Sequence, residues 1–188
     1  MNELLKNHIR KITPVNDDEF DAISTYFTAQ RFKKHQFLVQ TGKPAPYEFF
    51  VTKGLLKSEV TDSSGKTHIL QFAYEEWWIS DMQAFNSGEP ASLDIDCLEN
   101  TEVLSITYDA KERLCANFRC MEYFFRKKSN AGNIALQKRV LMLMQASAAE
   151  RYEQLIHQYP QMHARISKKL IAACLGITRE TLSRLSNS

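Results

Sequence analysis

Side chains able to read or hold DNA gather near the end of the chain, over residues 178–184. Arg179 and Arg184 can each direct two N–H donors at guanine O6 and N7, and Glu180 can accept a hydrogen bond from a cytosine amino group. Hydroxyl and ammonium groups bind phosphate oxygens, which positions a protein on DNA without reading its sequence. The candidates for phosphate contacts are Thr178, Thr181, Ser183, Lys168 and Lys169. These side-chain types could bind double-stranded DNA and would favour sites that contain G·C pairs.

Two short helices joined by a tight turn are predicted to carry these side chains, over residues 168–185. Apolar residues recur at helical spacing on both sides of Gly176, namely Ile171, Leu175, Ile177, Leu182 and Leu185. Gly176 can adopt the left-handed conformation that a turn requires, and the small Ala172 lets the second helix cross the first closely. Thr178 is expected to cap the second helix. The spacing indicates a helix-turn-helix, although an ordinary helical hairpin in a protein core would also supply the leucines.

The composition, with 44% hydrophobic and 24% charged residues among 188, is that of a globular protein with a core. No stretch approaches the ~18 consecutive apolar residues of a membrane span, and the first residues carry scattered charges instead of the apolar run of a secretory signal. A cytoplasmic protein without a membrane partner is therefore expected. The net charge is +2, and residues 148–188 carry six basic and three acidic side chains. This excess favours a polyanionic partner for the C-terminal part.

The spacing of cysteines and histidines gives no sign of a metal, cofactor or enzyme site. No CxxC pair occurs and the five histidines are scattered, so reduced and mostly buried thiols are expected. The four cysteines are Cys97, Cys115, Cys120 and Cys174. A cupin-like metalloenzyme would need closely spaced histidines and a carboxylate on its strands, and the strand region offers only His35 and His68. We expect a protein that is not an enzyme and that uses no cofactor.

Changes in the spacing of apolar residues predict the elements of the first two thirds of the chain. Residues 2–29 predict two short helices, the second capped near Asn16 or Asp17. Over residues 31–107 apolar residues alternate between turn signals, of which 62–65 is a hairpin turn. Many short strands at regular spacing predict a β barrel or sandwich.

Helical spacing returns over 109–143, which predicts one helix or a short helix followed by a long one. Residues 147–158 predict another helix, because Ser147 and Glu150 have the spacing of a capping box. A symmetric partner would bury the long helix, so a dimer seam is expected there. Its polar middle, 126–130, interrupts any clean heptad, and no register is assigned.

The order of these elements and several motifs resemble the Crp/Fnr family of bacterial transcription regulators. The motifs are Gly42, Gly54 within 49–55, Gly65-Lys66, residues 149–152 and residues 175–184. The resemblance implies an α+β fold, with an N-terminal β-roll (a cyclic nucleotide-binding-like jelly roll), flanking helices, a long connecting helix and an all-α helix-turn-helix domain. The implied domains are a sensor at 1–110, a connecting and dimerisation helix at 111–146, and a DNA-binding domain at 147–188. Only residues 186–188 follow the last predicted helix, so no C-terminal wing is expected.

The effector site departs from the pattern of the cyclic nucleotide-binding relatives. Those relatives carry a glutamate for the ribose hydroxyl and an arginine for the cyclic phosphate, where this chain has Asp81 and Ala91. Alanine cannot bind a phosphate, so cyclic AMP is not expected. The candidate effector pocket consists of Ser80, Asp81, Met82, Ala91 and Ser92. Trp77 and Trp78 are expected in the core rather than in an apolar pocket.

Within the family, residues 71–72 and 76–81 look like the branch common in Bacteroidetes. The resemblance implies a homodimeric, sequence-specific transcription regulator that binds an inverted-repeat operator, with Arg179, Glu180 and Arg184 as base readers. An unidentified small-molecule effector and RNA polymerase are further candidate partners. The alternative is a small-molecule-binding regulatory module with a weak or non-functional DNA-binding tail.

Overall fold

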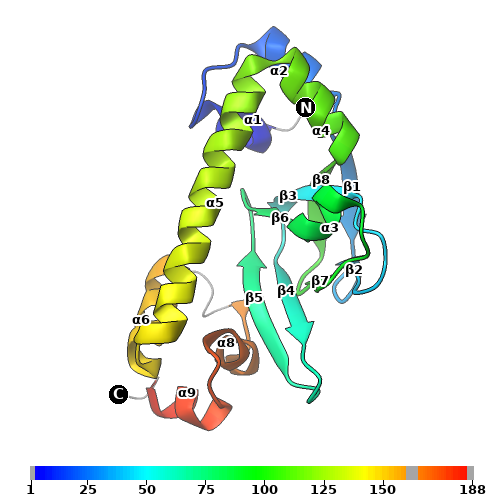
Figure 1. Cartoon of the computed structure of the whole chain (residues 1–188). Helices are drawn as coiled ribbons and strands as arrows, with labels where there is room; N and C mark the ends of the chain where they lie inside the picture. Colours follow the sequence, from blue (N-terminus) through cyan, green and yellow to red (C-terminus); the bar gives the residue numbers. More distant parts are fainter. Residues whose placement is uncertain (1–2, 160–164, 186–188) are drawn as a thin grey trace. The chain divides into compact units, whose positions relative to one another are not determined.

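The computed structural model describes residues 3–159 and 165–185 (Figure 1). The chain divides into two compact units, the first made of residues 1–60 and 71–129 and the second of residues 61–70 and 130–188. The second unit therefore combines the C-terminal helices with the tip of a hairpin from the strand region. The predicted absence of a C-terminal wing concerns residues 186–188, which lie outside the described part of the chain.

Helices and strands occur largely where the apolar spacing predicts them, with one addition, but Thr28 and Ala29, expected within a helical region, begin the first strand. The helices are α1 (Glu3–Arg10), α2 (Asp17–Ser24), α3 (Met82–Ser87), α4 (Tyr108–Asn117), α5 (Arg119–Gln145), α6 (Ala148–Gln158), α8 (Lys168–Leu175) and α9 (Arg179–Leu185). The strands are β1 (Thr28–Phe32), β2 (Phe37–Val39), β3 (Tyr47–Lys53), β4 (Leu56–Thr61), β5 (Thr67–Ala73), β6 (Trp78–Ile79), β7 (Asp94–Cys97) and β8 (Thr101–Thr107). The addition is α3, whose six residues are too few to show a helical period.

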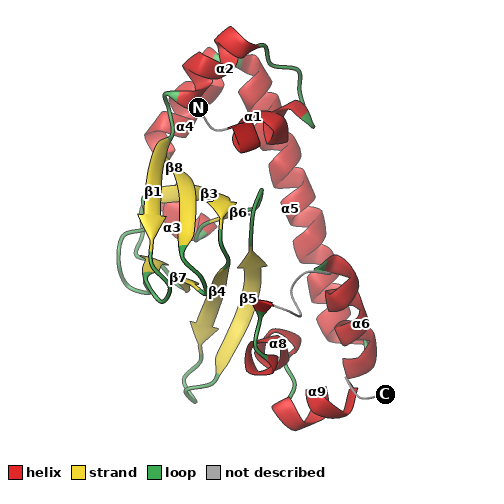
Figure 2. Cartoon of the chain, turned by 180° about the vertical axis from the view of Figure 1, so that it is seen from behind, coloured by secondary structure: helices red, strands yellow, loops and turns green. Residues whose placement is uncertain are grey.

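The strands form two four-stranded sheets, in the orders β1-β8-β3-β6 and β2-β7-β4-β5 (Figure 2). This arrangement confirms the predicted β-roll. β3 and β8 pair antiparallel, with Phe49 opposite Ser105 and Phe50 opposite Leu104. Because successive side chains of a strand point to opposite faces, Phe49 and Phe50 enter two different cores.

One core lies within the roll and the other on its helix-covered face. The inner core is built from buried residues such as Val39, Phe49, Val51, Ile95 and Val103. The helix-side core contains Leu5, Ile9, Phe20, Phe50, Leu104, Phe124 and Phe125. The expected core packing of Trp78 is confirmed, because its ring centroid lies 5.2 Å from that of Phe50 and 5.5 Å from that of Phe125.

Local capping signals occur where the sequence predicts them. The Asn16 side chain accepts from the Glu19 N–H and the Glu19 carboxylate accepts from the Asn16 N–H, which forms a capping box at α2. Ser147 and Glu150 form the predicted box at α6. Of the two alternatives for residues 109–143, the short helix followed by a long one is correct, because Phe118 has extended dihedral angles between α4 and α5.

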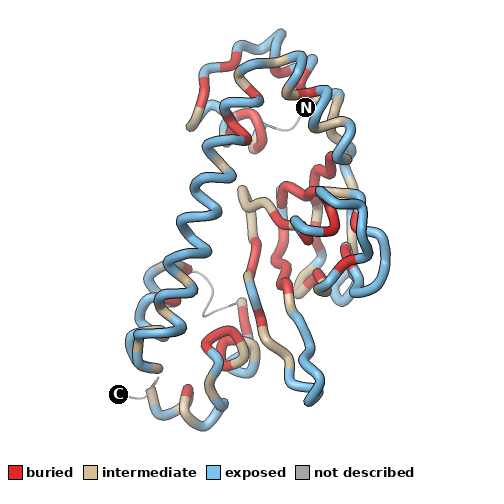
Figure 3. Tube along the Cα trace, viewed as in Figure 1, coloured by how far each residue is buried: buried red, intermediate tan, exposed pale blue. Residues whose placement is uncertain are grey.

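No helix in the described ranges is both long enough and apolar enough to cross a membrane. The longest, α5, is exposed over most of its second half, whereas the buried residues concentrate in the strands of the first unit and in α8 of the second (Figure 3).

Candidate nucleic-acid interface

The turn between α8 and α9 has the geometry of a Schellman motif. Gly176 ends α8 with φ 68° and ψ 28°, in the left-handed region that glycine adopts without steric cost. The Ile177 N–H donates to the Ala172 carbonyl at 3.0 Å, and the Gly176 N–H to the Ala173 carbonyl at 3.4 Å. The predicted role of Gly176 is therefore confirmed.

Thr178 caps α9 as the sequence predicts. Its Oγ1 accepts a hydrogen bond from the Thr181 N–H at 3.2 Å, and the two threonine hydroxyls lie 3.1 Å apart. Leu182 is 1% exposed and faces α8, whose Ile171, Ala172 and Leu175 are also buried. α9 thus buries Leu182 and leaves Arg179, Glu180 and Arg184 exposed.

The predicted DNA-reading side chains lie on the outer surface of this helix pair. Arg179, Glu180 and Arg184 are exposed on α9. Thr178 is exposed, whereas Thr181 and Ser183 are half-buried. Lys168 and Lys169 are exposed in the first turn of α8. The fold thus brings six of the eight predicted residues together around one helix and places the two lysines at the start of the other.

Glu180 is held in its ionised form. Hydrogen bonds from its own backbone N–H and from the Thr178 hydroxyl lower the pKa of its carboxyl below the ordinary value. An ionised carboxylate has only acceptors, so at neutral pH Glu180 can pair with a cytosine amino group and repels a phosphate.

Arg139 of α5 is a further residue of this unit, and the sequence patterns do not identify it as part of a site. Its Nη2 donates to the Ile69 carbonyl at 2.8 Å and to the Cys174 carbonyl at 3.1 Å, and its Nη1 lies 3.6 Å from Cys174 Sγ. These partners are far from Arg139 in the sequence and two of them are backbone atoms, so no sequence motif predicts the contact.

The predicted effector residues lie in the first unit, where Asp81 already binds its own chain. Its Oδ1 accepts from the Ala84 N–H at 3.1 Å and caps α3, and its Oδ2 accepts from the Ser92 N–H at 2.7 Å and the Ser92 hydroxyl at 2.9 Å. Burial raises the pKa of this carboxyl, but the hydrogen bonds outweigh burial and the pKa lies below its ordinary value. Asp81 is 2% exposed and has the geometry of a structural cap.

The three remaining residues of the predicted pocket, Ser80, Met82 and Ala91, are placed differently. Ser80 Oγ donates to the Tyr47 carbonyl at 2.8 Å. Ala91 is buried, and its backbone pairs with Gly42 and Lys43 at 2.8 Å. Met82 is 46% exposed. The structure therefore joins Asp81 to Ser92, and an effector site formed by the five residues stays a prediction.

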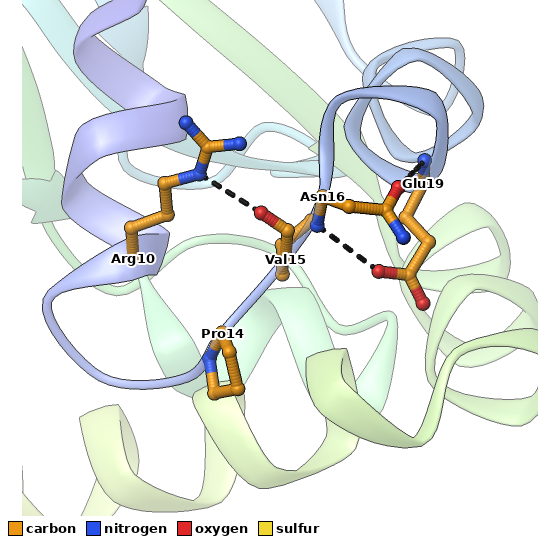
Figure 4. Close-up of a pocket in the computed structure, with 5 residues that line it drawn as sticks. All are labelled: Arg10, Pro14, Val15, Asn16 and Glu19. Atoms are coloured by element: carbon orange, nitrogen blue, oxygen red, sulfur yellow. Dashed lines mark hydrogen bonds between the residues drawn. The ribbon is translucent and has the colours of Figure 1, made fainter.

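A surface pocket of the first unit lies elsewhere, between α1 and α2 (Figure 4). It is lined by Arg10, Pro14, Val15, Asn16 and Glu19 and contains none of the predicted effector residues. Arg10 Nε donates to the Val15 carbonyl at 2.9 Å, and Asn16 and Glu19 form the capping box. These polar groups bind one another and hold the chain between the two helices.

In the described part of the chain, neither the thiols nor the possible metal ligands form a reactive cluster. Burial raises the pKa of Cys97, Cys115, Cys120 and Cys174 above the ordinary thiol value. Over residues 3–159 and 165–185, no three His, Cys, Asp or Glu side chains are grouped as they would be around a metal ion.

Comparison with known proteins agrees with this architecture. Residues 29–118 match the family described as the cyclic nucleotide-binding domain. FixK2 from Bradyrhizobium japonicum superposes with a TM-score of 0.75 at 19% identity, covering 86% of this chain and 83% of FixK2. A Eubacterium rectale protein assigned to the Crp/Fnr family of transcriptional regulators superposes with a TM-score of 0.68 at 14% identity, covering 92% and 82%. The chain shares the fold of these structures.

The same fold occurs in CLP of Xanthomonas campestris, a global regulator that responds to c-di-GMP. Its structure superposes with a TM-score of 0.74 at 13% identity, covering 92% of this chain and 90% of CLP. A search of curated proteins by sequence gave no match. At these identities the similarity shows the fold alone.

Proposed function

We propose that the protein is a homodimeric, sequence-specific DNA-binding transcription regulator of the Crp/Fnr type. The observation that carries the proposal is the outward placement of Arg179, Glu180 and Arg184 on a helix that is capped by Thr178 and held by the Gly176 turn. In the helix-turn-helix, the second helix enters the major groove. There, two arginines and one ionised glutamate favour a half-site with G·C pairs.

A second copy of the chain is the proposed partner of α5. Six large apolar residues in the second half of this helix are between 43% and 76% exposed, namely Ile134, Leu136, Val140, Leu141, Leu143 and Met144. With 3.6 residues per turn, they spread over about half of the helix surface, and Leu136 and Leu143 lie one turn before and one turn after Arg139. Burying this apolar surface against its symmetric copy would remove it from water. The recognition helices of such a dimer read half-sites about 34 Å apart, as in an inverted repeat.

The roll is proposed as the sensor, for an effector other than cyclic AMP. Ala91 has no group that can bind a phosphate, and the carboxylate of Asp81 is already occupied by Ala84 and Ser92. The residues at 71–72 and 76–81 support membership of the Bacteroidetes-type branch. RNA polymerase is a further proposed partner, as for a regulator that acts at promoters.

An operator selection tests the DNA-binding function. The purified full chain is mixed with a random duplex library, and bound DNA is sequenced over successive rounds. An inverted repeat with G·C pairs in each half is expected. Absence of enrichment at low salt, with no effect of Arg179→Ala on binding, would refute sequence-specific recognition and favour a sensor module with a non-functional DNA-binding tail.

A further inference from the structure

Arg139 joins three segments of the second unit. Its Nη2 bridges the carbonyls of Ile69, in β5, and Cys174, in the last turn of α8, at 2.8 and 3.1 Å. Its Nη1 lies 3.6 Å from Cys174 Sγ. Over residues 131–141, all of which are described, Arg139 is the only residue that is not exposed. The side chain is therefore turned toward α8 and the hairpin while its neighbours on α5 face solvent.

The chemistry of guanidinium suits this position. The last carbonyls of a helix have no partner within the helix and carry a partial negative charge, so a cation there is stabilising. Arginine stays charged and presents its donors in a rigid plane, which allows one nitrogen to bridge two carbonyl oxygens. Cys174 is 3% exposed and Arg139 is half-buried, so the contact is partly shielded from water.

The third partner, the hairpin tip, is itself held by local contacts. Asp62 Oδ1 accepts from the Ser64 N–H at 2.9 Å and from the Lys66 N–H at 3.0 Å. The other carboxylate oxygen lies 2.8 Å from His68 Nε2. These bonds fix the turn that leads into β5, so the Ile69 carbonyl belongs to an ordered segment.

We propose that Arg139 is a positioning residue for DNA recognition. It ties the last turn of α8 to the hairpin tip and to α5, two residues before the Gly176 turn, and thereby sets the direction in which α9 leaves that turn. The inference rests on the proposed function and extends it to a residue that does not touch DNA. Contacts to bases need an exact helix orientation, whereas contacts to phosphates tolerate reorientation. A change at Arg139 should therefore weaken binding to the operator more than binding to unrelated DNA.

The test compares Arg139→Met and Arg139→Lys in the full chain with Lys138→Met. Lys138 is the exposed neighbour on α5, so its replacement removes the same charge without touching the contact. Fluorescence anisotropy measures affinity for the selected operator and for an unrelated duplex. Alkylation by iodoacetamide, read by mass spectrometry, measures protection of Cys174, with the buried Cys97 of the first unit as internal control.

The expected result is a loss of operator affinity of about tenfold or more in Arg139→Met, with affinity for unrelated duplex changed less than about twofold. Alkylation of Cys174 should become about tenfold faster while Cys97 stays protected, because the opening is local. Arg139→Lys should fall between wild type and Arg139→Met, because an ammonium donates to carbonyls without the planar fork. Lys138→Met should behave as wild type in both measurements.

Unchanged operator affinity in Arg139→Met overturns the proposal. A parallel loss of operator and unrelated binding with loss of Cys97 protection also overturns it, since that pattern reports general unfolding. If Arg139→Met does not fold, Arg139→Lys decides by the same criteria. If the wild-type protein selects no operator, the proposed function is wrong, and with it the role of Arg139 in DNA recognition. Alkylation of Cys174 then shows separately whether Arg139 holds α8. Faster alkylation in Arg139→Met would in that case give Arg139 a structural role only.

Discussion

Lys128 of α5 forms an ion pair with Glu48 of β3, whose side chain is 1% exposed. Lys111 of α4 binds the other oxygen of the same carboxylate at 2.8 Å. Burial alone would raise the pKa of the Glu48 carboxyl, but the two lysines outweigh burial and lower it. Lys128 also lies 4.4 Å from the centroid of the Trp78 ring. One carboxylate thus attaches two helices to the outer face of the roll.

Replacing this carboxylate is predicted to be costly. Glu48→Gln should destabilise the protein by about 3–5 kcal/mol, because it leaves two buried or half-buried lysines without their counter-charge. Lys128→Met should cost less, since Lys111 still pairs with Glu48 and the methionine can pack on Trp78. Urea unfolding followed by tryptophan fluorescence measures both changes. The exposed Lys127→Met is the control, and equal stability of Glu48→Gln and wild type would contradict the prediction.

A pH dependence is predicted from His8 of α1. Its Nε2 accepts from Trp78 Nε1 at 3.3 Å and its Nδ1 faces Glu76 at 3.5 Å, so the neutral ring is the form that fits. Burial lowers the pKa of His8 below 6.5, against the opposing effect of Glu76. The unfolded chain then binds more protons than the folded one, so stability is highest above pH 6.5 and falls as the pH drops from 6.5 toward the folded pKa.

Unfolding free energies measured between pH 7 and pH 5 check this dependence. His8→Gln should flatten the slope, because an amide can accept from the Trp78 N–H without titrating. The exposed His35→Gln should leave the slope as in wild type. An identical slope in wild type and His8→Gln would assign the dependence to another group.

Asp81 is predicted to matter for stability in the absence of any effector. Asp81→Ala removes the cap of α3 and both bonds from Ser92, and should cost about 1–3 kcal/mol. Asp81→Asn keeps an oxygen for the cap and should cost less. Chemical denaturation of the two variants without ligand gives the comparison. Full stability of Asp81→Ala would show that the carboxylate is free for a ligand.

Base readers and phosphate contacts should respond differently to mutation. Arg179→Ala should lower operator affinity by about 1–3 kcal/mol and relax the preference for one G·C pair. Lys169→Ala should weaken operator and unrelated DNA alike and reduce the slope of log K against log salt by about 0.9. Anisotropy titrations at several salt concentrations separate the two effects. A sequence-dependent effect of Lys169→Ala would contradict its assignment to phosphate.

The apolar half of α5 should control dimerisation. Val140→Glu puts a charge at the centre of the exposed apolar surface and is expected to give monomers in sedimentation velocity runs. Its affinity for the inverted repeat should fall by more than its affinity for an isolated half-site. Ala135→Glu introduces the same charge on the opposite half of the helix and should leave the dimer intact. If Val140→Glu still forms dimers, the dimer interface does not include the apolar half of α5.

Much of this protein could be predicted because its signals are local. The capping boxes at Asn16 and Ser147, the cap at Thr178 and the left-handed Gly176 each depend on residues at most four positions away, so their spacing predicts their geometry. Alternation along the strands predicted the roll for the same reason, since it reflects the pleat of each strand.

The hydrogen-bond partners of Asp81 and the placement of the hairpin tip could not be predicted from local spacing. Asp81 is predicted to line an effector pocket, and this stays a prediction. Its bonds to Ala84 and Ser92 could not be predicted, because α3 is too short for its period and its cap to be recognised. The hairpin tip at 61–70 belongs to the same compact unit as the C-terminal helices, which no boundary signal indicated.

The sequence by itself therefore determined the elements other than α3, the roll, and the spacing that places Arg179, Glu180 and Arg184 on the exposed side of α9, because helical and strand periods decide which side chains share a face. Tertiary structure alone decided which distant groups meet. Glu48 and Lys128 are 80 positions apart and Ile69 and Arg139 are 70 positions apart, and each pair depends on chain folding that no local pattern encodes. Every residue has a backbone carbonyl, so the sequence does not distinguish those of Ile69 and Cys174 from the others. They become the partners of Arg139 only because folding buries both at one point in space.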